Sequence, residues 1–120
     1  MSKTVLIVED NELNMKLFHD LLDSQGYETL QTREGLQAMA LARQHMPDLI
    51  LMDVVMPNLN GFQATRSICR EASTKHIPIV LVTTKDQDTD RVWGMRQGAR
   101  DYIVKPVDPD ELVTKIRAFD

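Results

Sequence analysis

Three carboxylates stand where apolar runs of this sequence end, and their chemistry is that of a cation-assisted phosphate site. Glu9 and Asp10 directly follow the run VLIV, and Asp53 directly follows LILM. Carboxylates that crowd together repel one another and bind protons more tightly unless a cation is present. Mg²⁺ relieves such repulsion and suits a site with one or two protein carboxylates, several waters and a phosphate oxygen. A carboxylate can also act as a nucleophile and form an aspartyl-phosphate.

An amine and two hydroxyls follow two further apolar runs. Lys105 comes directly after DYIV, and Thr83 and Thr84 come directly after IPIVLV. A fixed positive charge beside Mg²⁺ would neutralise a phosphoryl group arriving at Asp53, which is most of what phosphoryl transfer requires of a protein. We therefore interpret Asp53 as a nucleophile that a rigid, apolar strand holds at the open end of a sheet.

Each of these residues also has a simpler explanation. Asp10 or Asn11 could be only the N-cap of a helix, and taken alone that explanation is the better one. Lys105 could be a salt-bridge partner of Asp53, and the Thr83 hydroxyl could satisfy a backbone group at a strand end. These explanations do not account for why every charged strand end falls on one edge, so the combination favours a functional site.

The elements that must position these residues are short β-rich runs separated by amphipathic stretches. Such alternation predicts βαβ units and a parallel sheet, in which ligands bind beyond the carboxyl ends of the strands. Three runs are apolar throughout, without alternating polar residues, and are expected in the centre of the sheet. The run at 27–32 mixes polar and apolar residues and is expected at an edge. The five runs are residues 4–8, 27–32, 48–52, 77–82 and 101–104.

Five helices are expected between and after these runs. The first begins near Asn11, ends before Gly26 and carries a leucine face formed by Leu13, Leu17, Leu21 and Leu22. The second must end before Pro47, the third begins near Gly61, and the fourth covers about 87–97. The fifth has the clearest start, with Asp108 as N-cap and Pro109 at the first helical position.

Length and charge limit the function classes. A chain of 120 residues predicts a single domain over 1–120, and its net charge of −4 disfavours nucleic acid as a partner. The first residues hold neither a signal-peptide core nor a membrane span, which predicts a soluble cytoplasmic protein without a membrane partner. A single cysteine, Cys69, cannot form an internal disulfide.

The sequence resembles the receiver domain of two-component response regulators over residues 4–119. The matching segments are VLIVEDN at 5–11, DLILMDVVMPNLNG at 48–61, VTT at 82–84 and GARDYIVKP at 98–106. The resemblance implies an α/β, flavodoxin-like (βα)5 fold, with a doubly wound parallel five-stranded sheet in strand order 2-1-3-4-5.

The resemblance also implies a set of metal ligands. Asp53 matches the phosphoacceptor. Asp10 matches the direct Mg²⁺ ligand, and Glu9 is expected to act through water. The backbone carbonyl of Val55 matches the third protein ligand to the metal.

Three further residues match positions that contact or respond to the phosphoryl group, and a fourth matches a proline of fixed backbone geometry. Thr83 matches the switch hydroxyl, Tyr102 the switch aromatic and Lys105 the lysine that contacts the phosphate. Pro106 matches the proline that follows a cis peptide bond in this family.

The function implied is that of a phosphorylation-dependent switch. A sensor histidine kinase or histidine phosphotransferase would supply the phosphoryl group, and a downstream protein would read the face formed by helix four, the last strand and helix five. Self-catalysed phosphoryl transfer and slow autodephosphorylation are expected, without turnover of an external substrate, in a monomer or weak dimer. Trp93 could lie on that face or be buried against the sheet.

The two parts of the chain resemble receivers of different pathways. Residues 1–52 resemble cell-cycle single-domain receivers, and residues 76–108 resemble receivers of twitching-motility systems. A recombined or engineered chain with a junction near 53–57 and natural divergence both fit this pattern.

Three rival functions fit parts of the same sequence. An aspartyl-phosphate hydrolase needs an acid two residues beyond its nucleophile, where this sequence has Val55. A flavin carrier needs a first loop that cradles phosphate, which Glu9 and Asp10 would repel. A partner-binding domain that has lost phosphorylation stays open, although the set Asp10, Asp53, Thr83 and Lys105 argues against it. The three histidines, His19, His45 and His76, lie away from the predicted edge.

Overall fold

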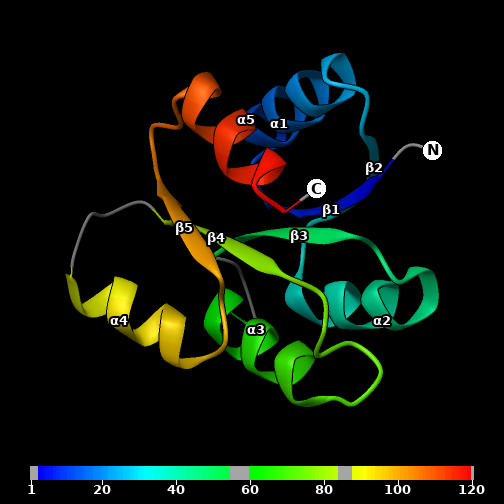
Figure 1. Cartoon of the computed structure of the whole chain (residues 1–120), viewed down its shortest axis with the longest axis vertical. Helices are drawn as coiled ribbons and strands as arrows, with labels where there is room; N and C mark the ends of the chain where they lie inside the picture. The colour runs from blue at the N-terminus through cyan, green and yellow to red at the C-terminus, as the bar shows by residue number, and fades with distance from the viewer. Residues whose placement is uncertain (1–2, 55–59, 84–87, 120) are drawn as a thin grey trace.

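Five strands and five helices alternate along the chain (Figure 1). The computed structural model describes residues 3–54, 60–83 and 88–119, with only the backbone described at 88–91. The strands are β1 (Thr4–Val8), β2 (Glu28–Thr32), β3 (Leu49–Asp53), β4 (Ile79–Thr83) and β5 (Asp101–Val104). The helices are α1 (Glu12–Ser24), α2 (Gly35–His45), α3 (Gly61–Arg70), α4 (Asp88–Arg96) and α5 (Pro109–Arg117).

The five strands form one parallel sheet in the order β2-β1-β3-β4-β5, which confirms the predicted topology. The register aligns the carboxyl ends of the strands. Val8 lies opposite Met52, Asp53 lies opposite Val82, and Thr83 lies opposite Val104. Residues that directly follow β1, β3, β4 and β5 therefore meet along one edge of the sheet.

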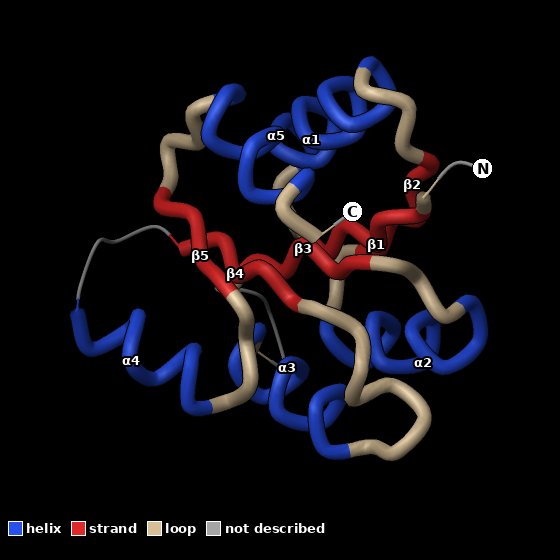
Figure 2. Tube along the Cα trace, viewed as in Figure 1, coloured by secondary structure: helices blue, strands red, loops and turns tan. Residues whose placement is uncertain are grey.

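Helices cover both faces of the sheet (Figure 2). On one face α1 and α5 contribute Phe18, Leu22, Leu112 and Ile116 to the core. On the other face α2 and α3 contribute smaller side chains, among them Ala38, Ala42 and Ala64, together with Ile68. All residues of β3 and β4 are buried, whereas β2 at the edge is only partly covered, as its mixed sequence predicted.

The predicted leucine face of α1 is confirmed at Leu22, which is buried, and at Leu21, which packs partly buried against the core, but it is wrong at Leu13 and Leu17. Leu13 is 79% exposed and Leu17 is 45% exposed, whereas Phe18 and Leu22 are buried. Met15, Phe18 and Leu22 are spaced as i, i+3 and i+7, which places them on one stripe of a helix. This stripe carries the large aromatic ring toward the sheet, so the stripe through Leu13 and Leu17 faces solvent.

Capping side chains fix where three helices begin. The Asn11 side chain accepts from the N–H of Asn14 at 3.0 Å, and Asp108 accepts from Asp110 at 3.0 Å. Asn60 and Gln63 form a reciprocal capping box at the start of α3. Asn11 is thus the cap of α1, which leaves the Asp10 side chain outside that role.

Positive φ angles lie at three helix ends. They occur at Gly26 (φ 91°) after α1, Met46 (φ 48°) after α2 and Gly98 (φ 111°) after α4. Glycine adopts such angles at little cost, so Gly26 and Gly98 stop their helices, Gly26 as the sequence predicted. None of the helices in the described ranges has the length and apolar character needed to span a membrane.

Candidate functional site

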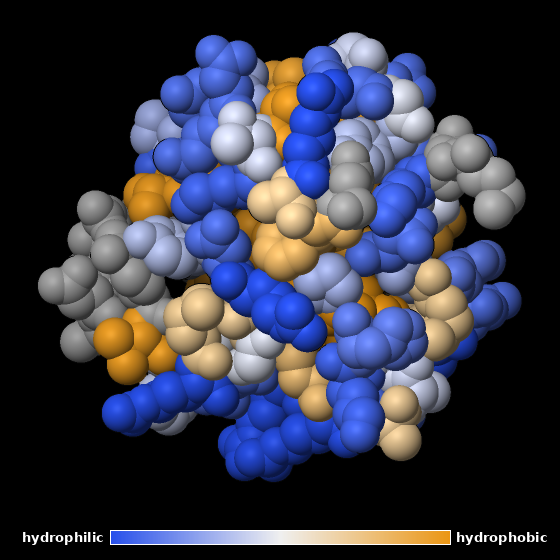
Figure 3. Space-filling view, viewed as in Figure 1, coloured by the Kyte–Doolittle hydropathy of each residue, from blue (hydrophilic) through white to orange (hydrophobic). Residues whose placement is uncertain are grey.

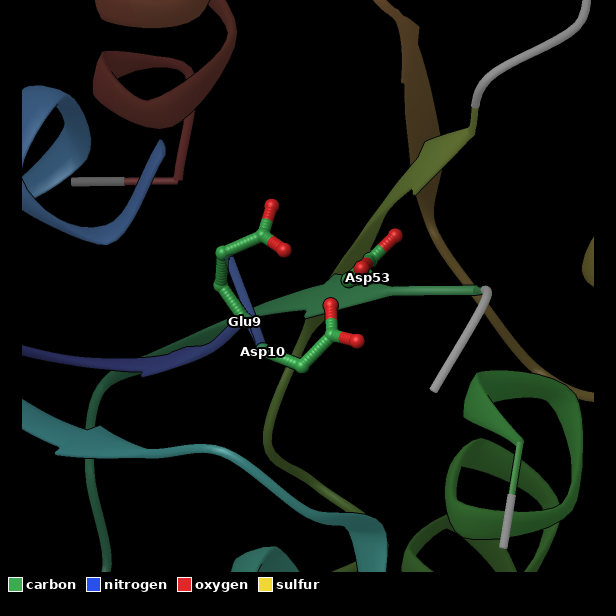
Figure 4. Close-up of side chains that lie close together, drawn as sticks. All are labelled: Glu9, Asp10 and Asp53. Atoms are coloured by element: carbon green, nitrogen blue, oxygen red, sulfur yellow. The ribbon is translucent and has the colours of Figure 1, made fainter. Parts of the chain in front are cut away.

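Glu9, Asp10 and Asp53 form an acidic cluster at the carboxyl ends of β1 and β3 (Figure 4). One carboxylate oxygen of each residue lies within 4.8 Å of the corresponding oxygens of the other two. Glu9 is 1% exposed and Asp53 is 2% exposed, whereas Asp10 is exposed. The cluster is therefore buried at its base and open to solvent at Asp10.

The acidic cluster fits a small divalent cation. Three carboxylates at this spacing repel one another, and hard oxygen ligands are those that Mg²⁺ prefers. The exposed carboxylate of Asp10 leaves a side from which an ion and its waters can approach. Val55, whose carbonyl was expected as a further ligand, lies outside the described residues.

Lys105 bridges the two buried carboxylates of the acidic cluster. Its Nζ lies 2.9 Å from Oε1 of Glu9 and 3.5 Å from Oδ1 of Asp53. The shorter contact is an ion pair, because Oε1 of Glu9 has no directed hydrogen bond among the described groups. The other oxygen of Glu9 accepts from the N–H of Asn11 at 3.2 Å. Lys105 therefore pairs more closely with Glu9 than with Asp53, the partner that the simpler explanation named.

The two carboxylates raise the pKa of Lys105. Burial alone would lower this pKa, but the close contact with the Glu9 carboxylate and the charges of Asp53 and Glu9 outweigh the burial. The ammonium is accordingly held in its charged form at neutral pH. Two buried negative charges thus face one fixed positive charge at this site.

Thr83 and Pro106 lie at the same edge of the sheet. Thr83 is buried at the end of β4, and its carbonyl accepts from the N–H of Lys105 at 2.6 Å. The peptide bond between Lys105 and Pro106 is cis. Thr84 lies outside the described residues.

Tyr102 lies in the middle of β5, opposite Leu81 of β4. Its side chain is partly buried and packs against the core on the α2 and α3 face. Thr83 and Tyr102 therefore come from the two neighbouring strands β4 and β5, which lie two and three strands away from β1 and its carboxylates.

Trp93 lies on the surface of α4. It is 51% exposed, and its neighbours Val92 and Met95 are exposed as well, so burial of Trp93 against the sheet is wrong. Figure 3 shows mainly hydrophilic residues on this face of the molecule, with a hydrophobic area over α4. Apolar side chains gathered on one short helix are typical of a contact surface.

The histidines lie outside the acidic cluster. Nδ1 of His19 lies 2.6 Å from the Thr29 hydroxyl, between α1 and β2. Among the described residues, the acidic cluster is the one grouping of His, Cys, Asp and Glu side chains close enough to share a metal ion. Histidine ligands are therefore not part of this site.

Residues 5–117 match the sequence profile of the response regulator receiver domain. The chain therefore belongs to the receiver domain family of two-component signalling, in which the domain acts as a phosphorylation-dependent switch. This confirms the family that the strand-end residues predicted.

Two sequence relatives cover nearly the whole chain. The protein PilH of Pseudomonas aeruginosa is 52% identical over 114 residues, which are 95% of this chain and 94% of that protein. The polar-differentiation response regulator DivK of Brucella ovis is 44% identical over 119 residues, 99% of this chain and 97% of that protein. Because both identities are averages over nearly the full length, the proposed division at 53–57 stays a prediction.

A solved relative carries a metal at the corresponding kind of site. The receiver domain of a sensor histidine kinase from P. aeruginosa has a TM-score of 0.92 and 32% identity, with 99% of this chain and 98% of that chain covered. Its crystal structure holds a magnesium ion coordinated in the active-site cleft. The CheY4 chemotaxis protein of Vibrio cholerae superposes with a TM-score of 0.94 at 28% identity, over 100% of both chains.

Proposed function

We propose that Asp53 accepts a phosphoryl group from a phosphohistidine and that this event switches the protein between two surface states. The donor is a sensor histidine kinase or a histidine phosphotransferase. The observation that carries the proposal is the gathering of three carboxylates and one ammonium from β1, β3 and the end of β5. An ion-pair network with only a structural role would not need the third, exposed carboxylate of Asp10.

The residues of the acidic cluster divide into ligands and a nucleophile. Asp10 and Asp53 would hold Mg²⁺ directly, Glu9 would act through water, and the Val55 carbonyl is proposed as a further ligand. When bound, Mg²⁺ would neutralise part of the charge on the phosphoryl oxygens. Its presence in a relative's active-site cleft supports this assignment.

The transfer step forms one bond and breaks one bond. An Asp53 carboxylate oxygen attacks the phosphorus, the P–N bond breaks, and its electron pair returns to the donor imidazole. Lys105 already lies 3.5 Å from Oδ1 of Asp53, so its ammonium is in place to pair with a phosphoryl oxygen. In slow autodephosphorylation, water attacks the same phosphorus and releases inorganic phosphate and the free carboxylate.

The response to the phosphoryl group passes through β4 and β5. The Thr83 hydroxyl would turn toward the phosphoryl oxygens, and the Tyr102 ring would move inward into the space that this turn leaves. Such a local change in charge biases a two-state element. The face built from α4, β5 and α5 then changes, and the exposed Trp93 is a suitable anchor for a downstream protein.

We further propose that residues 1–120 act as one cytoplasmic receiver domain, as a monomer or weak dimer. The net charge of −4 supports protein rather than nucleic acid partners, and we propose no membrane partner.

Intact mass spectrometry tests the proposed acceptor. Incubation with acetyl phosphate and Mg²⁺ should add one phosphoryl group to the wild-type chain and none to Asp53→Asn. The matched control is Asp23→Asn, which removes an exposed carboxylate on α1 and should still gain the group. Chelation of Mg²⁺ by EDTA should prevent the addition of the phosphoryl group to both the wild type and Asp23→Asn.

A second arm tests the donor. A histidine phosphotransferase loaded with radioactive phosphate should pass its label to the wild type and to Asp23→Asn. Label that still reaches Asp53→Asn at the wild-type rate would show that another residue is the acceptor.

A further inference from the structure

Lys115 of α5 contacts both the backbone and the ring of Tyr102. Its Nζ donates to the Tyr102 carbonyl at 2.6 Å and lies 4.9 Å from the centre of the ring. The same Nζ lies 3.4 Å from Oδ1 of Asp101, and this oxygen accepts from the Tyr102 N–H at 2.8 Å. Asp101, Tyr102 and Lys115 thus form a closed group, which we call the β5 network.

The β5 network engages Tyr102 from the outer edge of the sheet. Strand β5 pairs with β4 alone among the described strands, and residues of a strand alternate in the direction of their backbone groups. The N–H and C=O of Tyr102 bond to side chains of Asp101 and Lys115, so they point away from β4. The ammonium of Lys115 is therefore on the outer side of Tyr102.

The ring and the ammonium belong to opposite layers of the fold. The Tyr102 ring packs against the core on the α2 and α3 face. Lys115 comes from α5, whose Leu112 and Ile116 are buried on the other face. Figure 1 shows β5 at the edge of the sheet with α4 and α5 on either side of it. Lys115 reaches round this edge and lies over a ring that also packs against the core.

The contact with the ring depends on the position of the ring, whereas the contact with the backbone does not. An ammonium over an aromatic ring is attracted by the ring's quadrupole, and the attraction grows as the pair leaves water. The Lys115 side chain is 26% exposed, so the contact is largely desolvated. An inward movement of the ring toward β4 would break the ring contact and leave the carbonyl bond in place. Lys115 therefore stabilises one position of the ring over the other.

We propose that Lys115 is a positioning residue that sets the equilibrium of Tyr102 between its position in the β5 network and the inward position. A group that contacts one of two states shifts their populations by its differential interaction alone. This inference rests on the proposed function, because it assigns a second position to Tyr102. It adds a residue on α5 that determines how readily the switch responds to the phosphoryl group.

Ring resonances of ¹³C-labelled tyrosine report the position of Tyr102 directly. The chain has two tyrosines, and Tyr27 is buried in the core on the α1 face, so its signal reports whether the fold is intact. Beryllofluoride with Mg²⁺ serves as a stable mimic of the phosphoryl group on Asp53. The two wild-type spectra, with and without beryllofluoride, define the path along which the Tyr102 signal moves.

Lys115→Met removes the charge and keeps a long unbranched side chain. Without beryllofluoride, its Tyr102 signal should lie part of the way toward the beryllofluoride position, corresponding to an increase of about two- to fivefold in the ratio of inward to network positions. Lys115→Arg retains a cation over the ring and should restore the wild-type signal. The matched control is Lys16→Met, which breaks an exposed ion pair with Asp20 on α1 and should leave the Tyr102 signal unchanged.

The possible failures are distinguishable. Coincident Tyr102 signals of Lys115→Met and wild type, with the wild-type signal still moved by beryllofluoride, would overturn this inference and leave the proposed function standing. A wild-type signal that does not move at saturating beryllofluoride would overturn the switch role of Tyr102, and the inference with it.

A second variant decides the matter if Lys115→Met does not fold, as loss of the Tyr27 signal would show. Asp101→Asn keeps an acceptor for the Tyr102 N–H but removes the charge that attracts Lys115. Its Tyr102 signal should move in the same direction by a smaller amount. An unmoved signal in this folded variant would overturn the inference.

Discussion

Gly61→Ala tests how closely α3 is packed against the strand that carries Asp53. A Cβ at residue 61 would lie 2.2 Å from the backbone oxygen of Asp53 and 2.8 Å from Cα of Val54. Ordinary contacts are near 3.5–4.0 Å, so more than about 1 Å of movement is required. β3 is paired on both sides, by β1 and β4, so the displacement must fall on α3.

Moving α3 loosens two kinds of contact. The N–H of Gly61 donates to the carbonyl of Val54 at 2.9 Å, and such a bond contributes about 1 kcal/mol. Ala64 and Ile68 of the same helix are buried in the core, and overpacking strain in a well-packed core costs about 1–3 kcal/mol. A gain in helix propensity of up to about 1 kcal/mol opposes these losses. We expect a net loss of about 2–3 kcal/mol in the free energy of unfolding.

Urea unfolding followed by circular dichroism measures this loss, and the melting temperature should fall by roughly 10 °C. Because the displaced contact is with Asp53 itself, labelling by acetyl phosphate should also slow. The matched control is Gly94→Ala in α4, where the Cβ would meet Cδ1 of Leu81 at 2.4 Å, the end of a flexible side chain. That variant should stay within about 1 kcal/mol of wild type. An unchanged urea midpoint for Gly61→Ala would refute the reasoning.

Three further perturbations address the charges and the thiol. Asp10→Asn should raise the free energy of unfolding by about 0.5–1 kcal/mol in EDTA, because it removes one of three carboxylates that repel one another. Added Mg²⁺ should stabilise the wild type more than the variant. Equal effects of Mg²⁺ on the two melting temperatures would contradict this. The raised pKa of Lys105 predicts that its ion pairs contribute fully below its ordinary value of 10.5 and are lost as pH rises through the higher folded value. Glu9→Gln should weaken that alkaline loss in urea titrations, and an identical profile would argue against the pairing. Burial raises the pKa of the Cys69 thiol, and the charge of Arg100 opposes this only in part, so iodoacetamide should react with it more slowly than with free cysteine at pH 8. A rate equal to that of free cysteine would show that the thiol is more accessible than the structure indicates.

The convergence of the acidic cluster could be predicted because it follows from backbone rules, whereas the order of the strands was implied by the family resemblance. Apolar runs ending in Glu9 and Asp53 had to be parallel strands, and parallel strands end on one edge. The partner of Lys105 could not be predicted, because the choice between Glu9 and Asp53 depends on ångström-level side-chain geometry. Both carboxylates carry the same charge in the sequence, and only the folded distances of 2.9 and 3.5 Å separate them.

The faces of helices were harder to predict than their limits. Leucine count alone suggested that Leu13 and Leu17 face the core, yet the sheet accepts the stripe with the aromatic Phe18. The start of α3 near Gly61 was predicted correctly, and the sequence also held the signal of its capping box, since Asn60 stands three positions before Gln63. The β5 network gave no signal in sequence, since Lys115 is fourteen residues from Asp101 and reaches it around a strand edge.

The turns that precede the strands lie at the end of the sheet opposite the one that carries Asp10 and Lys105. In the turn between α3 and β4, Ala72 and Ser73 are exposed, and neither belongs to a helix or strand. A fluorescent reporter or a tethering peptide inserted there would be separated from the reactive carboxylates by the full length of the sheet. The architecture thus allows the chain to be immobilised or tracked without obstructing the rim where its chemistry is expected.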